Sequence, residues 1–340
     1  MRKFHTGSIV VGAVLLAYLI LKIGPGELWQ ELRAFGWGLV PFILLEGVVG
    51  LFYTLGWARC LSPAHRDLPF AHLWAVNLAG NSISYFTPTA TLGGEVVKGA
   101  LLSLDRRGAE AAAGVMIAKL SYALAQLMGV VIGSLCVVWK IQLPLSATLA
   151  MGAASALLGG GMVAFLLIQR AGKLGSLVRW AVDHGIGGEA LKKAARRITE
   201  VDESLKLFYR ERPRDLPISM LWHGVGMIFG VVKTWYFVSV VAGGGLFGGA
   251  GVFFLSSWFD LVTFMVPLGI GVQEGSRVLA FRVMGFSLAA GLGYGVALRL
   301  EQIFWASFGL FLYARILGGK TALRLFRAGA APESEKFLEK

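Results

Sequence analysis

The feature that most constrains the fold is a charged segment, interrupted by proline and glycine, that occurs twice in the chain. Residues 81–98 read NSISYFTPTATLGGEVVK, and residues 260–277 read DLVTFMVPLGIGVQEGSR. Four positions match at one constant separation of 179 residues: Asn81 and Asp260, Pro88 and Pro267, Glu95 and Glu274, and Lys98 and Arg277. Four matches in register indicate an internal duplication, so two related halves are expected.

The composition places this duplicated segment in a membrane protein. Hydrophobic residues make up 56% of the chain and charged residues 15%, and the mean hydropathy is +0.67. A soluble domain is closer to about half apolar and about a quarter charged. The net charge of +12 comes from basic residues that lie between apolar runs, a placement that fits the positive-inside rule and anionic lipids rather than nucleic acid.

Six apolar runs are interpreted as full membrane spans. They cover residues 6–21, 37–58, 111–139, 145–168, 216–242 and 287–317. The first run resembles a signal peptide, but no small-residue cleavage pattern follows it, so a retained helix is expected.

Each copy of the duplicated segment lies in a further apolar stretch, at 70–104 and 252–286, that is broken in its middle. The prolines remove a backbone donor, and the glycines allow a tight turn. The predicted fold is therefore an all-α polytopic membrane protein with about six full spans and two broken or re-entrant helical hairpins. Eight or so shorter spans are the alternative.

One transmembrane domain is expected over residues 1–317, with repeat 1 at about 37–139 and repeat 2 at about 216–317. Between them, residues 170–215 carry eleven basic and seven acidic residues and predict one or two amphipathic helices on the membrane surface. A cytoplasmic tail covers residues 318–340.

The distribution of basic loops predicts the orientation. With the N-terminus in the cytoplasm, the basic loops, the 170–215 segment and the C-terminal tail all fall inside. The loop at 22–36, Lys140 and a glycine-rich turn at 243–251 fall outside. The two hairpins then enter from opposite sides, which makes the repeats inverted, as in many secondary transporters. Full crossings in place of hairpins would leave the loop sides unchanged.

Charged side chains inside the apolar runs must face one another or a wet cavity, because each costs about 2.5–3.5 kcal/mol at the bilayer centre. Two interpretations follow: a buried ionic latch between the repeats, or a polar midplane cavity where half-helix N-termini and basic residues hold an anionic head group such as phosphate. The i, i+3 spacing allows ion pairs between Glu95 and Lys98 and between Glu274 and Arg277.

Carboxylates aimed at a phosphate would repel it, so Glu95 and Glu274 are assigned to gating or to orienting Lys119 and Arg299. The substrate-binding candidates are Asn77, Asn81, Gly93, Gly94, Glu95, Lys98, Lys119, Asp260, Pro267, Gly269, Gly271, Glu274, Arg277 and Arg299. Asn77 and Asn81 share a helix face, where interhelical hydrogen bonding is an equal alternative. Lys233 and Glu46 are weaker candidates for the same network, and Glu301 is a further charge in the last span.

Catalytic, metal and cofactor sites are not predicted. The five histidines are scattered, and the two cysteines lie in or beside apolar runs, which argues against a zinc site or a structural disulfide. Signatures of ATP hydrolysis or nucleophilic catalysis do not occur. An enzyme is therefore not expected.

These segments resemble the lysylphosphatidylglycerol synthase transmembrane family, a flippase-like group that includes the membrane half of MprF proteins. The resemblance is carried by TPTATLGGEVVKGALL at 87–102 and VPLGIGVQEGSRVLAFRVMG at 266–285, followed by Arg299, and it extends over about residues 6–317. It implies movement of a lipid between leaflets, namely aminoacylated phosphatidylglycerol in MprF, and polyprenyl-linked sugars or hopanoids as proposed for relatives. At the positions that match the motifs of the family, the resemblance implies that the central residues are Gly93, Gly94, Glu95, Lys98, Pro267, Gly269, Gly271, Glu274 and Arg299.

MprF synthases carry a C-terminal soluble domain, whereas about 23 residues follow the last span here, so lipid synthesis is not expected. The hopanoid-associated subgroup is the most specific resemblance. The sequence thus predicts a multi-pass protein of the bacterial inner membrane, with both termini cytoplasmic, that translocates an amphipathic, anionic lipid. The expected partners are phospholipid, polyprenyl-phosphate or hopanoid lipids, and not nucleic acid.

Several alternatives stay open at this stage. The chain could be a membrane-embedded lipid-modifying enzyme, or a scaffold that presents the 170–215 surface to a partner. The lipid, the direction of transport and a homo-oligomeric state are not determined by the sequence. Energy could come from a proton gradient acting through Glu95 or Glu274, or the protein could simply equilibrate the leaflets.

Overall fold

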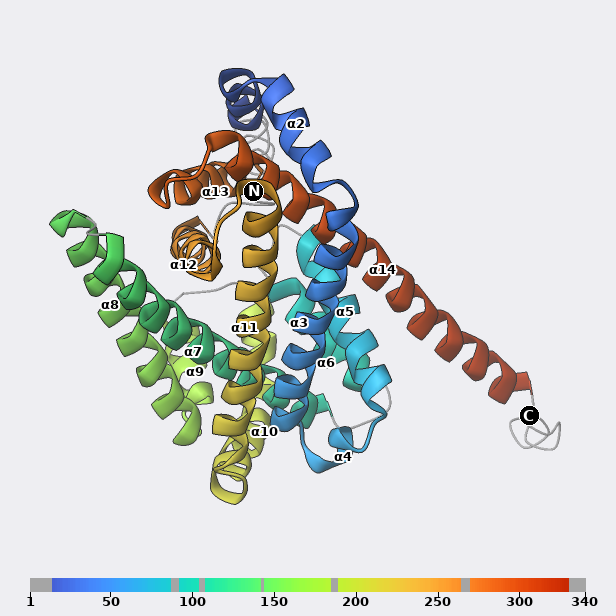
Figure 1. Cartoon of the computed structure of the whole chain (residues 1–340). Coiled ribbons are helices and arrows are strands. Elements are labelled where there is room, and N and C mark those ends of the chain that lie inside the picture. The colour runs from blue at the N-terminus through green and yellow to red at the C-terminus, as the bar shows by residue number, and fades with distance from the viewer. Residues whose placement is uncertain are drawn as a thin grey trace, which may run out of the picture.

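The computed structural model describes residues 14–86, 92–103, 108–141, 144–184, 189–263 and 270–329, and within them every regular element is a helix (Figure 1). After an apolar helix at Val14–Ile23, the elements are α2 (Pro25–Phe35), η1 (Gly36–Gly38), α3 (Leu39–Cys60), α4 (Pro63–Arg66), α5 (Phe70–Phe86), α6 (Leu92–Ser103), α7 (Gly108–Ile141), α8 (Leu145–Arg170), α9 (Leu174–Asp183), α10 (Glu189–Glu211), α11 (Asp215–Ala242), α12 (Leu246–Thr263), α13 (Val272–Val283) and α14 (Leu288–Gly329).

Five helices are long and apolar enough to cross a membrane. They cover Pro25–Cys60, Gly108–Val137, Leu145–Arg170, Asp215–Ala242 and Leu288–Gly318. Each overlaps one of the last five predicted spans, although Pro25–Cys60 begins within the predicted loop at 22–36. The shorter Val14–Ile23 helix lies at the first predicted span, which is described only from residue 14 onward. The all-α polytopic fold is thereby confirmed.

Each copy of the duplicated segment forms a helix, a break and a second, shorter helix. The pairs are α5 with α6 and α12 with α13, and α6 and α13 each have 12 residues. At 1.5 Å per residue they are about 18 Å long, well short of the roughly 30 Å hydrocarbon core. Neither short helix is therefore long enough to cross alone. Pro88 and Pro267, at the breaks, lie outside the described residues.

The helices of the two predicted halves pack in corresponding pairs. The helices α3 and α11 run side by side through the centre of the molecule (Figure 1). Around them α5 packs on α14 and α12 packs on α7, while α6 packs on α7 and α13 packs on α14. One helix of each broken hairpin thus packs on the last helix of the other predicted half, α5 on α14 and α12 on α7.

Two segments predicted as connections are largely helical. The expected loop at 22–36 contains α2, which begins with Pro25 in its first turn, where a missing N–H costs nothing, and which buries Leu28 and Phe35. The expected turn at 243–251 ends at residue 245, because α12 begins at Leu246. Its glycines permit close packing instead: a Cβ at Gly249 would overlap the backbone of Trp235 on α11.

The polar segment at 170–215 forms two helices, α9 and α10, one of the two forms predicted for it. The helix α10 packs on α7, α8 and α9, and its buried residues include Leu205 and Phe208. The buried carboxylate of Asp202 on α10 accepts hydrogen bonds from the backbone N–H groups of Leu174 (3.0 Å) and Gly175 (2.8 Å), at the first turn of α9.

Replacement of Asp202 by alanine is expected to loosen α9. The substitution leaves two N–H donors at a helix start without an acceptor, a change that costs about 0.5–2 kcal/mol at an ordinary N-cap. Hydrogen exchange of the α9 amides in the detergent-purified protein should become faster, whereas the exposed neighbour Glu203→Ala should leave it unchanged. Equal protection of α9 in both variants would contradict this assignment.

Candidate functional site

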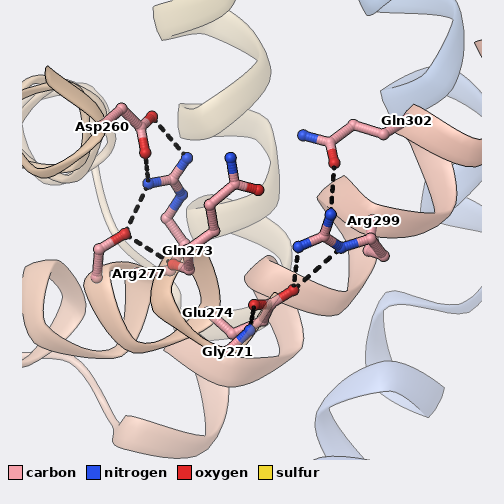
Figure 2. Close-up of polar contacts among 8 residues, drawn as sticks. Asp260, Gly271, Gln273, Glu274, Arg277, Arg299 and Gln302 are labelled. Atoms are coloured by element: carbon pink, nitrogen blue, oxygen red, sulfur yellow. Dashed lines mark hydrogen bonds and ion pairs between the residues drawn. The ribbon is translucent and has the colours of Figure 1, made fainter. Parts of the chain in front are cut away.

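In the second hairpin, Glu274 joins the start of α13 to α14 (Figure 2). Its Oε2 accepts the backbone N–H of Gly271 at 2.7 Å, and its Oε1 accepts Arg299 Nε at 3.1 Å and Arg299 Nη2 at 2.8 Å. Gly271 has φ 74°, a conformation that favours glycine. The Glu274 side chain is only 3% exposed, so both of its oxygens are engaged inside the protein. The Arg299 guanidinium also donates to Gln302 at 3.4 Å.

Arg277 links the two helices of the same hairpin, α13 and α12. Its Nη1 and Nη2 donate to Asp260 Oδ1 and Oδ2, each at 2.8 Å, in a bidentate ion pair between α13 and α12 (Figure 2). Arg277 Nη1 also donates to Ser276 Oγ at 2.8 Å. The Glu274–Arg277 pair that the spacing allowed is replaced by this one, because Asp260 offers a two-oxygen partner that matches the guanidinium fork.

In the first hairpin, a single carboxylate serves two lysines. Glu95 Oε1 lies 3.4 Å from Lys98 Nζ, on the same helix, and 3.4 Å from Lys119 Nζ on α7. Lys98 is buried, whereas the Lys119 side chain is 40% exposed. The difference from the second hairpin follows from one position, because neutral Asn81 stands where that hairpin has Asp260.

The start of α6 is packed tightly against α5. The Gly94 N–H donates to Ser84 Oγ at 3.1 Å, and a Cβ at Gly94 would overlap the carbonyl oxygen of Gly80. Glycine is therefore required where the two arms of the hairpin meet, and the contact fixes Glu95 one residue later.

The two hairpins thus repeat one ion pair and differ in net charge. In both, the glutamate of the short helix pairs with a basic residue on the following long helix: Glu95 with Lys119, and Glu274 with Arg299. The charges can be counted over the four matched positions and the basic residue on the following long helix. By this count the second hairpin has two acidic and two basic residues. The first has one acidic and two basic residues, and so carries one excess positive charge.

The structure describes three of the remaining candidate residues, all on α5 or α6 of the first hairpin. Buried Asn77 donates to Thr54 Oγ1 of α3 at 2.9 Å, so the structure gives it an interhelical hydrogen bond. Asn81 is exposed on α5. Gly93 lies with Gly94 in the first turn of α6. Pro267 and Gly269 lie outside the described residues.

A third charged cluster, which we call the triad, joins three spans: Glu46 on α3, Lys233 on α11 and Glu301 on α14. Lys233 Nζ lies 2.9 and 2.8 Å from the two oxygens of Glu301 and also contacts Glu46 Oε2. The sequence analysis offered Lys233 and Glu46 as weaker candidates for the network of the hairpins, and the structure joins them to Glu301.

Comparison with known proteins assigns the family. The sequence model described as "Lysylphosphatidylglycerol synthase TM region" matches residues 6–309. A UPF0104 membrane protein of Methanothermobacter thermautotrophicus is 36% identical over 118 residues, which are 34% of this chain and 35% of that protein. The match thus spans about a third of the curated relative. No solved structure matches. The chain is a multi-pass membrane protein that belongs to the family of the lysylphosphatidylglycerol synthase transmembrane region.

Proposed function

We propose that this protein moves an anionic lipid between the two leaflets, with the head group passing between the two broken hairpins. The observation that carries the proposal is the excess positive charge of the first hairpin, where Glu95 is the one carboxylate that pairs with Lys98 and Lys119 among the described residues. That charge lies beside the N-terminal turn of α6, whose helix dipole also favours an anion.

The pairings divide the basic residues into two groups. Arg277 is held by a bidentate partner and Lys98 is buried, so both are assigned to holding the hairpins in shape. Lys119, which is 40% exposed, and Arg299 are assigned to the head group. A phosphate oxygen could replace the glutamate oxygen at either base, since both make charge-assisted hydrogen bonds of the same kind.

The two faces of α6 suit an amphipathic substrate. Glu95 points into the protein toward two lysines, whereas its neighbour Val96 is 70% exposed. On α13, buried Glu274 and exposed Leu279 repeat this division. A lipid could therefore keep its acyl chains in the bilayer while its head group contacts the charged residues. Because the site is cationic, phosphate-containing lipids fit it better than uncharged hopanoids do.

We place the protein in the bacterial inner membrane, and the basic loops support an orientation with both termini in the cytoplasm. The two hairpins would then enter from opposite sides, so that each half opens the site to one leaflet.

Reconstitution into liposomes tests the proposal. The panel comprises fluorescent phospholipids, polyprenyl phosphates and an uncharged lipid, and dithionite quenching reports leaflet exchange. The wild-type protein should exchange anionic lipids faster than protein-free vesicles do. Lys119→Ala should lose most of this gain, whereas the exposed control Lys173→Ala should keep it. Mass spectrometry of the same lipids tests the enzyme alternative. A new covalent lipid species would support catalysis instead of transport.

A further inference from the structure

The triad offers a binding site that the proposed head-group path does not use. Its three residues come from α3, α11 and α14. Lys233 and Glu301 are deeply buried, with side chains 7% and 4% exposed, whereas Glu46 is 34% exposed. The cluster therefore has a closed inner end and a partly open outer end.

The surroundings of the triad supply no second cation among the described residues. The Phe42 ring lies 5.1 Å from Lys233 Nζ, and Tyr294 shares a 2.8 Å hydrogen bond with Thr234, next to Lys233. Among the described residues, the other titratable side chains that interact with the triad are the phenols Tyr53 of α3, Tyr122 of α7 and Tyr294 of α14, which are neutral at physiological pH. Arg277 of α13, which lies near Tyr294, is bound to Asp260.

Two carboxylates thus share one ammonium group within membrane-spanning helices. If all three residues were ionised, the triad would carry one negative charge without a partner, which is costly in a low-dielectric interior. A proton bound to either carboxyl would remove this excess charge. A proton is also the cation that fits here, because it needs no further ligands and Lys233 already fills the space between the two carboxyls.

We propose that Glu46, Lys233 and Glu301 form a binding site for one exchangeable proton, which enters and leaves through Glu46. The position of the triad links this proton to the hairpins. Arg299 and Glu301 are two residues apart on α14, about 200° around the helix, so they face opposite sides. Arg299 holds Glu274 of α13, and Glu301 holds Lys233 of α11. Protonation of the triad would loosen α14 from α11. If the protein moves lipid as proposed above, lipid movement would then depend on the proton gradient.

Infrared spectroscopy of the purified full-length protein tests the site without any lipid movement. A signal from a protonated carboxyl should be present in the wild type and disappear as the pH is raised, with release of about one proton per chain. Glu46→Gln should lack this signal, because Lys233 and Glu301 then form a neutral pair. Glu200→Gln, at an exposed acid of α10, should keep it. A wild type without the signal, or an unchanged signal in Glu46→Gln, would overturn the proton site.

Liposomes with an imposed proton gradient test the coupling. The lipid exchange rate of the wild type should change with the gradient, and that of Glu46→Gln should not. The same response in both would overturn the coupling. If the carboxyl signal behaves as expected but no lipid moves in any vesicle, the proton site stands and the proposed function fails.

Discussion

Replacement of Lys233 by methionine should lower the free energy of unfolding by about 3–5 kcal/mol, the usual cost of breaking a buried ion pair by removing one partner. Methionine fills a similar volume, so packing is largely kept. The cost comes from Glu301, which is 4% exposed and would lose the only cation that its two oxygens contact among the described residues. Unfolding of the detergent-purified variant, followed by circular dichroism, measures the change.

A second substitution provides the control. In the double variant Lys233→Met/Glu301→Gln the charge of buried Glu301 is gone, and the remaining carboxylate, Glu46, is 34% exposed rather than buried. Most of the lost stability should therefore return, and the double-mutant cycle should report a large coupling between the two positions. A Lys233→Met protein as stable as the wild type would show that the triad is not a buried ionic contact.

Replacement of Arg299 by alanine should lower lipid exchange by about tenfold or more. Arg299 donates twice to Glu274 Oε1 and is one of the two bases assigned to the head group. A hydrogen bond to a charged group contributes about 1.5–3 kcal/mol, and about 1.4 kcal/mol corresponds to a factor of ten. The lipid exchange rate of Arg299→Lys should lie between those of the wild type and Arg299→Ala, because lysine keeps the charge but not the planar two-nitrogen contact.

The matched control for this prediction is Arg315→Ala, an exposed arginine on the same helix. It should exchange lipids as the wild type does. Circular dichroism must show the same helical content in all three variants, so that a loss of exchange is not a loss of fold. Wild-type exchange by Arg299→Ala would remove Arg299 from the site.

Much of the fold was predictable because apolar length and internal register are local signals. The last five spans and both helix–break–helix segments follow from them. The turn predicted at 243–251 is present only over residues 243–245, because glycine serves both turns and close helix packing, and only the neighbouring side chains show which applies. In α12, Gly249 permits close contact with Trp235 of α11, and Gly248 and Gly251 lie against Phe286 and Met284.

The partners of the charged residues were less predictable, because ion pairs depend on which helices meet. The Glu95–Lys98 pair is present, whereas Arg277 turns to Asp260, since a bidentate partner on a neighbouring helix replaces the one a turn away. The triad was beyond sequence reasoning for the same reason. Its residues lie on three separate spans, and apolar patterns indicate only that each must face inward.

The central claim, that the broken hairpins carry a lipid head group, is tested most directly by leaflet exchange in liposomes with wild type and Glu274→Gln measured side by side. Glutamine keeps an oxygen for the Gly271 N–H but removes the charge that holds Arg299. Faster exchange of anionic lipids by the wild type than by empty vesicles, largely lost in Glu274→Gln, is the predicted result. Equal exchange by both proteins, or no exchange of any lipid by the wild type, would contradict the claim.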